Sequence, residues 1–256
     1  IEELVRQKLA EIEEKEQVKI LHAVESGSRA WGLASPDSDY DVRFVYVRPA
    51  PYYLKLEARR DVLELPMDGV LDVNGWDLDK TLRLLHASNP TLFEWFSSPV
   101  VYRGGEFTER FRPVMERCFR SRKGLWHYLS MAKSNCGEYL KGEQVKLKKY
   151  FYVLRPLLAC RWILEHGTPP PMAFRTLAQA ELPSELHSIT ESLLKQKIYS
   201  PETAYIPPID ALNAWLENET VRIQARIEAQ PSDPPVGWEE LNALFLSQLG
   251  IQAEIE

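Results

Sequence analysis

The chain has 256 residues, of which 45% are hydrophobic and 27% are charged, and its formal net charge at pH 7 is −6. This balance is typical of a soluble globular protein and excludes disordered, collagen-like and disulfide-stapled chains. The length suits one large domain or two ordinary ones. An acidic overall charge argues against a protein that simply coats nucleic acid.

Cysteines and apolar runs give no sign of a zinc site, a disulfide framework or a membrane segment. The three cysteines, at positions 118, 136 and 160, form an odd set without Cys-x-x-Cys spacing. The longest apolar run, over 151–164, is interrupted by Arg155 and Arg161. We therefore expect no signal peptide or membrane span, and a reducing, cytoplasmic location.

The first part of the chain has the pattern of an α/β unit. Leu4, Val5, Leu9 and Ile12 recur at helical spacing among charged residues, and short runs rich in Val, Phe and Tyr follow. From residue 77 the apolar spacing becomes helical again, on both sides of Asn89-Pro90. The pattern predicts a helix at 2–16, strands at 18–24, 40–47, 60–65 and 70–74, two helices, and an edge strand at 100–102.

The rest of the chain lacks strand signals and is predicted to be helical. Proline clusters divide it, because proline cannot continue a helix. The predicted helices are 107–119, 122–141, 144–166, 173–180, 184–197, 209–229 and 237–249. The fold class is therefore α+β: a small mixed sheet with flanking helices in a first domain, residues 1–105, followed by an all-helical second domain, residues 106–256.

Positive charge is concentrated in the helical part. Residues 117–161 contain eleven basic and two acidic residues, a local charge of +9 within an acidic protein; Lys141 is one of the basic residues. Such polarisation indicates an anionic ligand, for which phosphate is the usual choice, although a solvated basic pair of helices would have the same composition.

One stretch of the sequence contains the candidate catalytic residues. Gly27-Ser28 lies at a strand-to-helix turn, where glycine lets a phosphate approach and the serine hydroxyl and backbone amides can bind it. Eleven residues later come Asp39 and Asp41, which alternation along a strand directs to the same side. Adjacent carboxylates need a compensating cation, and Mg²⁺ or Mn²⁺ carried in with a nucleotide suits such oxygen ligands.

These features resemble the DNA polymerase β-type nucleotidyltransferase superfamily, and most closely its bacterial and phage RNA-repair-pathway family. The resemblance covers residues 20–165. It rests on the stretches 26–32, 37–41, 75–78, 89–90 and 149–156. The first two read Ser-Gly-Ser-Arg-Ala-Trp-Gly and Asp-Ser-Asp-Tyr-Asp. It implies that residues 1–105 are a catalytic domain with a polymerase β-like palm, and that the helical residues 106–256 bind the nucleotide or substrate.

The resemblance also implies a two-metal site and a reaction. A third carboxylate completes the site, and it is Asp72, inside a strand pattern, or alternatively Asp77, which an N-cap role would explain. Two Mg²⁺ or Mn²⁺ ions would bridge the triphosphate of a nucleoside triphosphate such as ATP. The third acid would orient or deprotonate an attacking hydroxyl, with release of pyrophosphate.

The helical part is predicted to hold the nucleotide. On a helix over 144–166, Lys148, Tyr152 and Arg155 fall at i, i+4 and i+7 and form a polar stripe, on which a base could stack while the cations hold phosphates. Lys149 and Tyr150 are the alternatives if the helix is rotated. Lys133 on the preceding helix and Arg29 after the turn are further candidates for phosphate contacts.

The expected acceptor is an RNA 3′ end. Transfer to a protein or a small molecule is the alternative within the enzyme class. A catalytically silent nucleotide or RNA sensor is the alternative outside it. A binding module has no need of adjacent acids that repel its anionic ligand, so the acids favour an enzyme.

Overall fold

The computed structural model describes residues 1–67, 69–140 and 142–251, so Lys141 lies outside the described part of the chain. The chain forms two compact units. The first contains Ile1–Gly27, Asp39–Cys118 and Pro235–Glu256, and the second contains Ser28–Ser38 and Phe119–Pro234. Neither unit is a continuous stretch of sequence.

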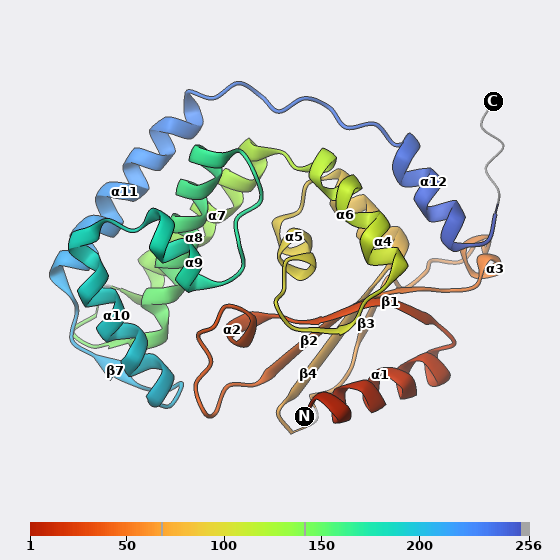
Figure 1. Ribbon diagram of the computed structural model, residues 1–256, viewed down its shortest axis with the longest axis horizontal. Helices are drawn as coiled ribbons and strands as arrows, with labels where there is room; N and C mark the ends of the chain where they lie inside the picture. Colours follow the sequence, from red (N-terminus) through yellow and green to blue (C-terminus); the bar gives the residue numbers. More distant parts are fainter. Residues whose placement is uncertain (68, 141, 252–256) are drawn as a thin grey trace. The chain divides into compact units, whose positions relative to one another are not determined.

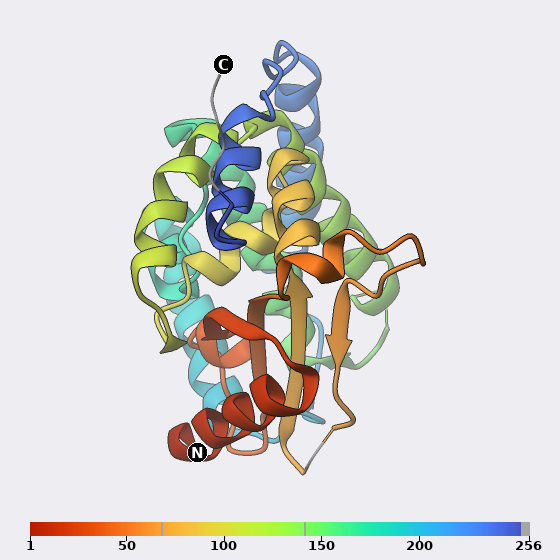
Figure 2. The ribbon, with the colours of Figure 1, turned by 90° about the vertical axis from the view of Figure 1, so that its right-hand side faces the viewer.

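A five-stranded mixed sheet forms the centre of the first unit. Its strands are β1 (Lys19–Glu25), β2 (Tyr40–Val47), β3 (Val62–Glu64), β4 (Leu71–Asp77) and β5 (Val101–Arg103), in the order β3-β4-β2-β1-β5. β2 and β4 are parallel, and the other neighbours are antiparallel. Figure 2 shows β3 at the outer edge of this sheet.

Helices cover both faces of the sheet (Figure 1). On one face lies α1 (Glu2–Glu16), whose Val5, Leu9 and Ile12 are buried against strand residues such as Phe44. On the other face lie α4 (Leu78–His86), α5 (Pro90–Phe96) and α6 (Glu106–Cys118). There the Trp76 ring of β4 packs against the Trp95 ring of α5, with centroids 3.9 Å apart and the planes tilted by 32°. The short α3 (Ala50–Tyr53) and the late helix α12 (Glu239–Gln248), which packs on α4, complete the unit.

The second unit is helical and is centred on one buried helix. α8 (Leu147–His166) contacts each of its helical neighbours, which explains why most of its residues are buried. The neighbours are α7 (Ser121–Tyr139), α9 (Phe174–Glu181), α10 (Ser184–Tyr199) and α11 (Asp210–Glu228). Two short strands, β6 (Val145–Lys146) and β7 (Tyr205–Ile206), pair antiparallel. The helix α2 (Gly27–Ala30) spans the junction of the two units in the chain.

The predicted α+β class is confirmed by the mixed sheet and the helical second unit. The compact units follow different limits from the expected division after residue 105, since α6 and α12 belong to the first unit and Ser28–Ser38 to the second. The assignment of a catalytic and a binding role to separate domains stays a prediction. Among the described residues, no helix is long and apolar enough to cross a membrane.

The packing of β4 against β2 generates a first prediction. A Cβ at Gly75 would lie 2.2 Å from the Phe44 ring, inside the core between the sheet and α1. We expect Gly75→Ala to lower the free energy of unfolding by about 2 kcal/mol, because the buried ring has to move. Urea denaturation measures this change.

The matched control is Gly137→Ala in α7, where a Cβ meets nothing within 4 Å. Alanine is the better helix former, so this variant should gain about 0.5 kcal/mol. Equal stability of Gly75→Ala and the unmodified protein would contradict the packing of β4 described above.

Candidate active site

Two carboxylates meet across the parallel strands of the sheet. The register of β2 and β4 places Asp41 directly opposite Asp72. Arg43 extends from β2 on the same face as Asp41, because side chains alternate along a strand. Its Nη2 atom donates to Asp41 Oδ1 at 3.0 Å and to Asp72 Oδ2 at 2.7 Å. One guanidinium nitrogen therefore joins the two acids.

Arg43 also binds the backbone of both strands. Its Nη1 atom donates to the carbonyl oxygens of Val42 at 3.1 Å and Asp72 at 2.9 Å. The Arg43 side chain is 18% exposed, whereas those of Asp41 and Asp72 are 28% and 45% exposed. The cation is thus the more buried member of the group, and both acids remain accessible to a ligand.

Gly27 packs directly against Asp41. Its φ is +59°, a left-handed conformation that favours glycine, and a Cβ at this position would lie 2.0 Å from Asp41 Oδ2. The backbone amide of Ser26 donates to the Asp41 carbonyl at 2.8 Å. Asp41 therefore has Gly27 beside one carboxylate oxygen and Arg43 on the other, so the structure brings the glycine of the turn and the acid pair together.

A buried glutamate that the motif analysis did not single out holds the backbone of this acid. Glu25, at the end of β1, is 1% exposed, and its Oε1 accepts a hydrogen bond from the Asp41 amide at 2.8 Å. The hydroxyl of Tyr102 donates to Glu25 Oε2, and Ser98 Oγ donates to the Glu25 carbonyl at 2.6 Å. Glu25 and β5 thus fix the position at which β2 enters the site.

The donor set fits a divalent ion that arrives with a nucleotide. Asp39 precedes β2 and is exposed, and within the described residues no three His, Cys, Asp or Glu side chains form a metal-binding group. Mg²⁺ commonly uses one or two carboxylates together with substrate phosphates and water, so a closed protein cage is not required. Two carboxylates that already share the Arg43 guanidinium, one of them lying against a glycine, meet that requirement.

Asp77 lies at the other end of β4. It is opposite Tyr46 in the register, five residues from Asp72, which corresponds to about 16 Å along a strand. Its Oδ1 accepts the Asp79 amide at 2.9 Å and caps α4, and Tyr53 donates to both of its oxygens. Burial raises the pKa of Asp77 to about 6. The structure therefore brings Asp72, and not Asp77, next to Asp41.

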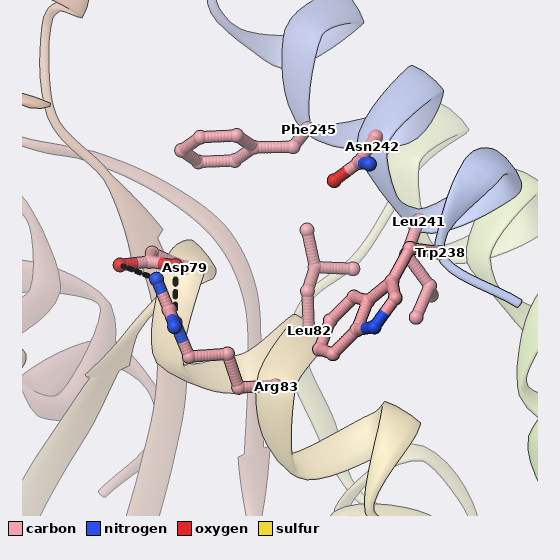
Figure 3. Close-up of a pocket in the computed structure, with 7 residues that line it drawn as sticks. All are labelled: Asp79, Leu82, Arg83, Trp238, Leu241, Asn242 and Phe245. Carbon is pink, nitrogen blue, oxygen red and sulfur yellow. Dashed lines mark hydrogen bonds and ion pairs between the residues drawn. The ribbon is translucent and has the colours of Figure 1, made fainter.

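A pocket lies between α4 and α12 at that distant end of the first unit (Figure 3). Its two charged residues are paired with each other, since Arg83 Nε donates to Asp79 Oδ1 at 2.8 Å. Its apolar lining comes from both helices: Leu82, Trp238, Leu241 and Phe245. The pocket gives no reason to move the candidate site away from Asp41 and Asp72.

In the second unit, a polar cluster fixes the segment that leads to the Asp-x-Asp motif. The Glu202 cluster consists of Ser35, Ser38, Lys148, Lys197 and Glu202. Glu202 accepts from Lys197 at 2.8 Å, Lys148 at 2.8 Å and Ser38 Oγ at 2.7 Å. Lys197, which is 3% exposed, also donates to Ser35 Oγ.

The electrostatics of the Glu202 cluster are those of a stable ion-pair network. Burial alone would raise the pKa of Glu202, but the hydrogen bonds from Lys148, Lys197 and Ser38 outweigh it and hold that pKa at about 2. Burial alone would lower the pKa of Lys148, and the bond to Glu202 raises it instead. Lys148, predicted from the sequence to hold a phosphate, is therefore already engaged by a carboxylate.

The predicted polar stripe on α8 is only partly exposed. Arg155 is 1% exposed, lies over the Trp31 ring at 4.5 Å and donates to the Met172 carbonyl at 3.2 Å. The structure does not bring it to the surface, because helices pack around α8. Tyr152 is half-buried and meets Trp31 edge-on, with ring centroids 5.6 Å apart.

Lys149 lies among aromatic rings. Its Nζ atom is 3.4 Å from the centroid of the Tyr139 ring and 5.1 Å from that of Tyr152. Burial and the neighbouring Lys148 lower the pKa of Lys149. Lysine beside half-buried rings is a combination suited to a base and its phosphate.

The remaining predicted binding residues belong to the second unit as well. The Ser28 carbonyl accepts the Leu33 amide at 2.8 Å, and Arg29 Nη2 donates to the Ser38 carbonyl at 2.6 Å. Lys133 is exposed on α7 and donates to Gln224. Their binding roles, like those of the other predicted residues, stay predictions.

Comparison with known proteins agrees with the motifs. The model of the RNA repair pathway DNA polymerase beta family matches residues 1–247, and the chain belongs to this family. It is 45% identical over 245 residues to the uncharacterized protein YcgL of Bacillus subtilis (strain 168), covering 93% of each chain.

A weaker similarity links the chain to a solved structure. This is a nucleotidyltransferase-like protein from Exiguobacterium sibiricum 255-15, with 14% identity and a TM-score of 0.32 over 88% of this chain and 75% of that one. Family membership, and not this similarity, assigns the chain to the nucleotidyltransferases of the polymerase β type.

The contact of Gly27 with Asp41 generates the second prediction. Gly27→Ala should lower the free energy of unfolding by about 2 kcal/mol or more, because the new methyl group has to displace the Asp41 carboxylate and the left-handed backbone adds about 1 kcal/mol. Chemical denaturation measures the change.

Gly32→Ala provides the control, since Gly32 also has a positive φ, of +75°, but nothing within 4 Å of a Cβ. It should lose only the backbone contribution of about 1 kcal/mol. If the two variants lose equal stability, Gly27 does not pack against Asp41 as described.

The Glu202 cluster generates the third prediction. Glu202→Gln leaves the buried ammonium of Lys197 without its carboxylate, so the free energy of unfolding at pH 7 should fall by about 3 kcal/mol. Because the folded pKa of Glu202 is depressed to about 2, its contribution is present above the unfolded pKa and is lost as the pH falls from 4.5 towards 2. The difference between the two proteins should therefore shrink over that range.

Glu191→Gln is the matched control, because Glu191 pairs with Arg175 on the surface, where both side chains are about half exposed. Such pairs contribute little, and we expect a change below about 1 kcal/mol. Denaturation at pH 7 and pH 3 compares the three proteins. A pH-independent difference between the unmodified protein and Glu202→Gln would exclude the ion pair as its cause.

Proposed function

We propose that the protein is a metal-dependent nucleotidyltransferase that transfers a nucleoside monophosphate from a nucleoside triphosphate to a hydroxyl group, with an RNA 3′ end as the acceptor. Membership of the polymerase β-type family supports nucleotidyl transfer. The observation that carries the proposal is the convergence of Asp41 and Asp72 on a single cation beside Gly27. Two carboxylates held opposite each other repel, and a divalent metal ion that arrives with the nucleotide would remove this repulsion.

The reaction needs no covalent enzyme intermediate. The acceptor oxygen forms a bond to the α-phosphorus, the bond from that phosphorus to the bridging oxygen breaks, and pyrophosphate leaves. Mg²⁺ or Mn²⁺ ions, two in the proposed complete site, would neutralise the charge that develops on the phosphates. Asp41 would hold the ions, with Asp39 as a further oxygen ligand at the start of β2.

Asp72 would orient the acceptor hydroxyl and take up its proton. Its side chain is the most exposed member of the group with Asp41 and Arg43, which suits contact with a macromolecular acceptor. Gly27 and the backbone that follows it would allow a phosphate to approach, together with Ser28 and Arg29.

The second unit would recognise the nucleotide or the RNA. Tyr152 and Lys149, with their neighbouring rings, suit base stacking and phosphate contact, and Lys133 adds an exposed cation. Lys148 and Arg155 would act in the structure that supports these residues, through Glu202 and Trp31 respectively. The local excess of basic residues between 117 and 161 favours a polyanionic acceptor over a neutral small molecule.

The fourth prediction concerns the acids. Incubation with labelled nucleoside triphosphates, Mg²⁺ and either total RNA or total protein should label the RNA. Asp41→Asn and Asp72→Asn should each reduce this transfer at least about a hundredfold, since each removes charge that stabilises the transition state.

Asp77→Asn is the matched control on the same strand as Asp72. It removes a carboxylate that caps α4 far from Asp41, so the folded fraction of this variant should transfer nucleotide as the unmodified protein does. If the label appears in the protein fraction instead, the acceptor is a protein and not RNA. Nucleotide binding without any transfer would favour a sensor, and full activity of both acid variants would end the proposal.

A further inference from the structure

Arg43 has no assigned role in the chemistry described above, yet it occupies the centre of the acid pair. Its Nη2 atom lies between Asp41 Oδ1 and Asp72 Oδ2, where a bound cation would contact the same two oxygens. It is also the most buried of the three side chains. A divalent ion that binds both acids therefore has to replace these hydrogen bonds.

We infer that Arg43 is the resident counter-ion of Asp41 and Asp72, and that its displacement makes metal binding and triphosphate binding depend on each other. The inference rests on the proposed function, because it concerns the metal and the nucleotide of the same site.

Charge links the two ligands. With Arg43 in place, the group of Asp41, Asp72 and Arg43 has one net negative charge, which repels a triphosphate. A divalent ion changes that to one net positive charge, which attracts it. Without nucleotide, a metal ion has to bind beside the positively charged guanidinium. Without metal, a nucleotide has to bind beside the net negative charge of the group. Each ligand therefore binds better when the other is present, and this coupling is reciprocal.

The backbone contacts of Arg43 keep the guanidinium in the site during this exchange. Nη1 donates to the Val42 and Asp72 carbonyls, and neither bond involves a carboxylate. When Nη2 loses the two acids, its N–H groups stay beside them and can donate to a phosphate oxygen. Arg43 would then be a positioning residue for the nucleotide. The same guanidinium would neutralise the acids before the ligands bind and would contact the nucleotide afterwards.

The test measures binding and not turnover. Mn²⁺ affinity of the full chain is measured by electron paramagnetic resonance, with and without a nonhydrolysable α,β-methylene analogue of ATP. Arg43→Gln removes the positive charge, so Mn²⁺ alone should bind about tenfold tighter or more than in the unmodified protein. The increase in Mn²⁺ affinity that the analogue produces should shrink by a similar factor, because the metal-loaded site is no longer positive.

Three further variants make the result decisive. Arg48→Gln, just beyond the opposite end of β2, removes an arginine that binds Glu16, and it should leave Mn²⁺ affinity unchanged. Asp41→Asn should abolish the Mn²⁺ binding. Arg43→Lys retains the charge and should keep Mn²⁺ affinity within about threefold of the original, which tests the role of charge even if Arg43→Gln does not fold.

Two outcomes overturn the inference, and they are distinguishable. If Mn²⁺ binds in an Asp41-dependent way but equally well to Arg43→Gln, or tenfold tighter to Arg43→Lys, Arg43 is not the competing cation and the metal site stands. If Mn²⁺ binds neither the original protein nor Arg43→Gln above the level of Asp41→Asn, the metal site of the proposed function fails as well.

Discussion

The pairing of two parallel strands is the constraint on which the candidate site depends. β2 and β4 run side by side in a register that places Asp41 opposite Asp72, so the fold holds two negative charges close together before any ligand arrives. The neighbouring residues hold these charges in place. Arg43 contributes the opposing charge, Glu25 secures the Asp41 backbone, and Gly27 leaves the second carboxylate oxygen uncrowded. The site is therefore an acid pair that a single arginine partly neutralises within the sheet.

Much of the fold could be predicted from the sequence, because its strands and helices have strong periodic patterns. The strand predicted at 40–47 coincides with β2, and the first helix has its predicted limits. β4 continues to residue 77, three residues beyond the prediction, because Trp76 finds a partner in Trp95 and Val62 pairs opposite it. The two-residue strands β6 and β7 and the four-residue helix α3 were not predicted, since such short elements have no period and form through tertiary contacts.

The candidate site was predictable where local spacing decides the geometry and unpredictable where distant residues meet. The strand pattern around Asp72 placed it in the sheet, and the register puts it opposite Asp41. Alternation also contains an unused signal for Arg43, which lies two residues beyond Asp41 on the same face. By contrast, the contact of Ser38 with Glu202 joins residues 164 apart in the sequence. The burial of Arg155 is also tertiary: spacing placed it on a polar stripe, but the surrounding helices and Trp31 cover that face.

The discontinuity of both units has a consequence for how the protein is made. The first unit has its whole sheet once Cys118 has been synthesised, but α12, which packs on α4, comes only after the entire second unit. The second unit likewise needs Ser28–Ser38, a segment translated some eighty residues before the rest of it. On the ribosome neither unit can be completed before residues of the other unit have been synthesised. Maturation of the acid-bearing sheet and of the helical unit is therefore linked by the path of the polypeptide itself.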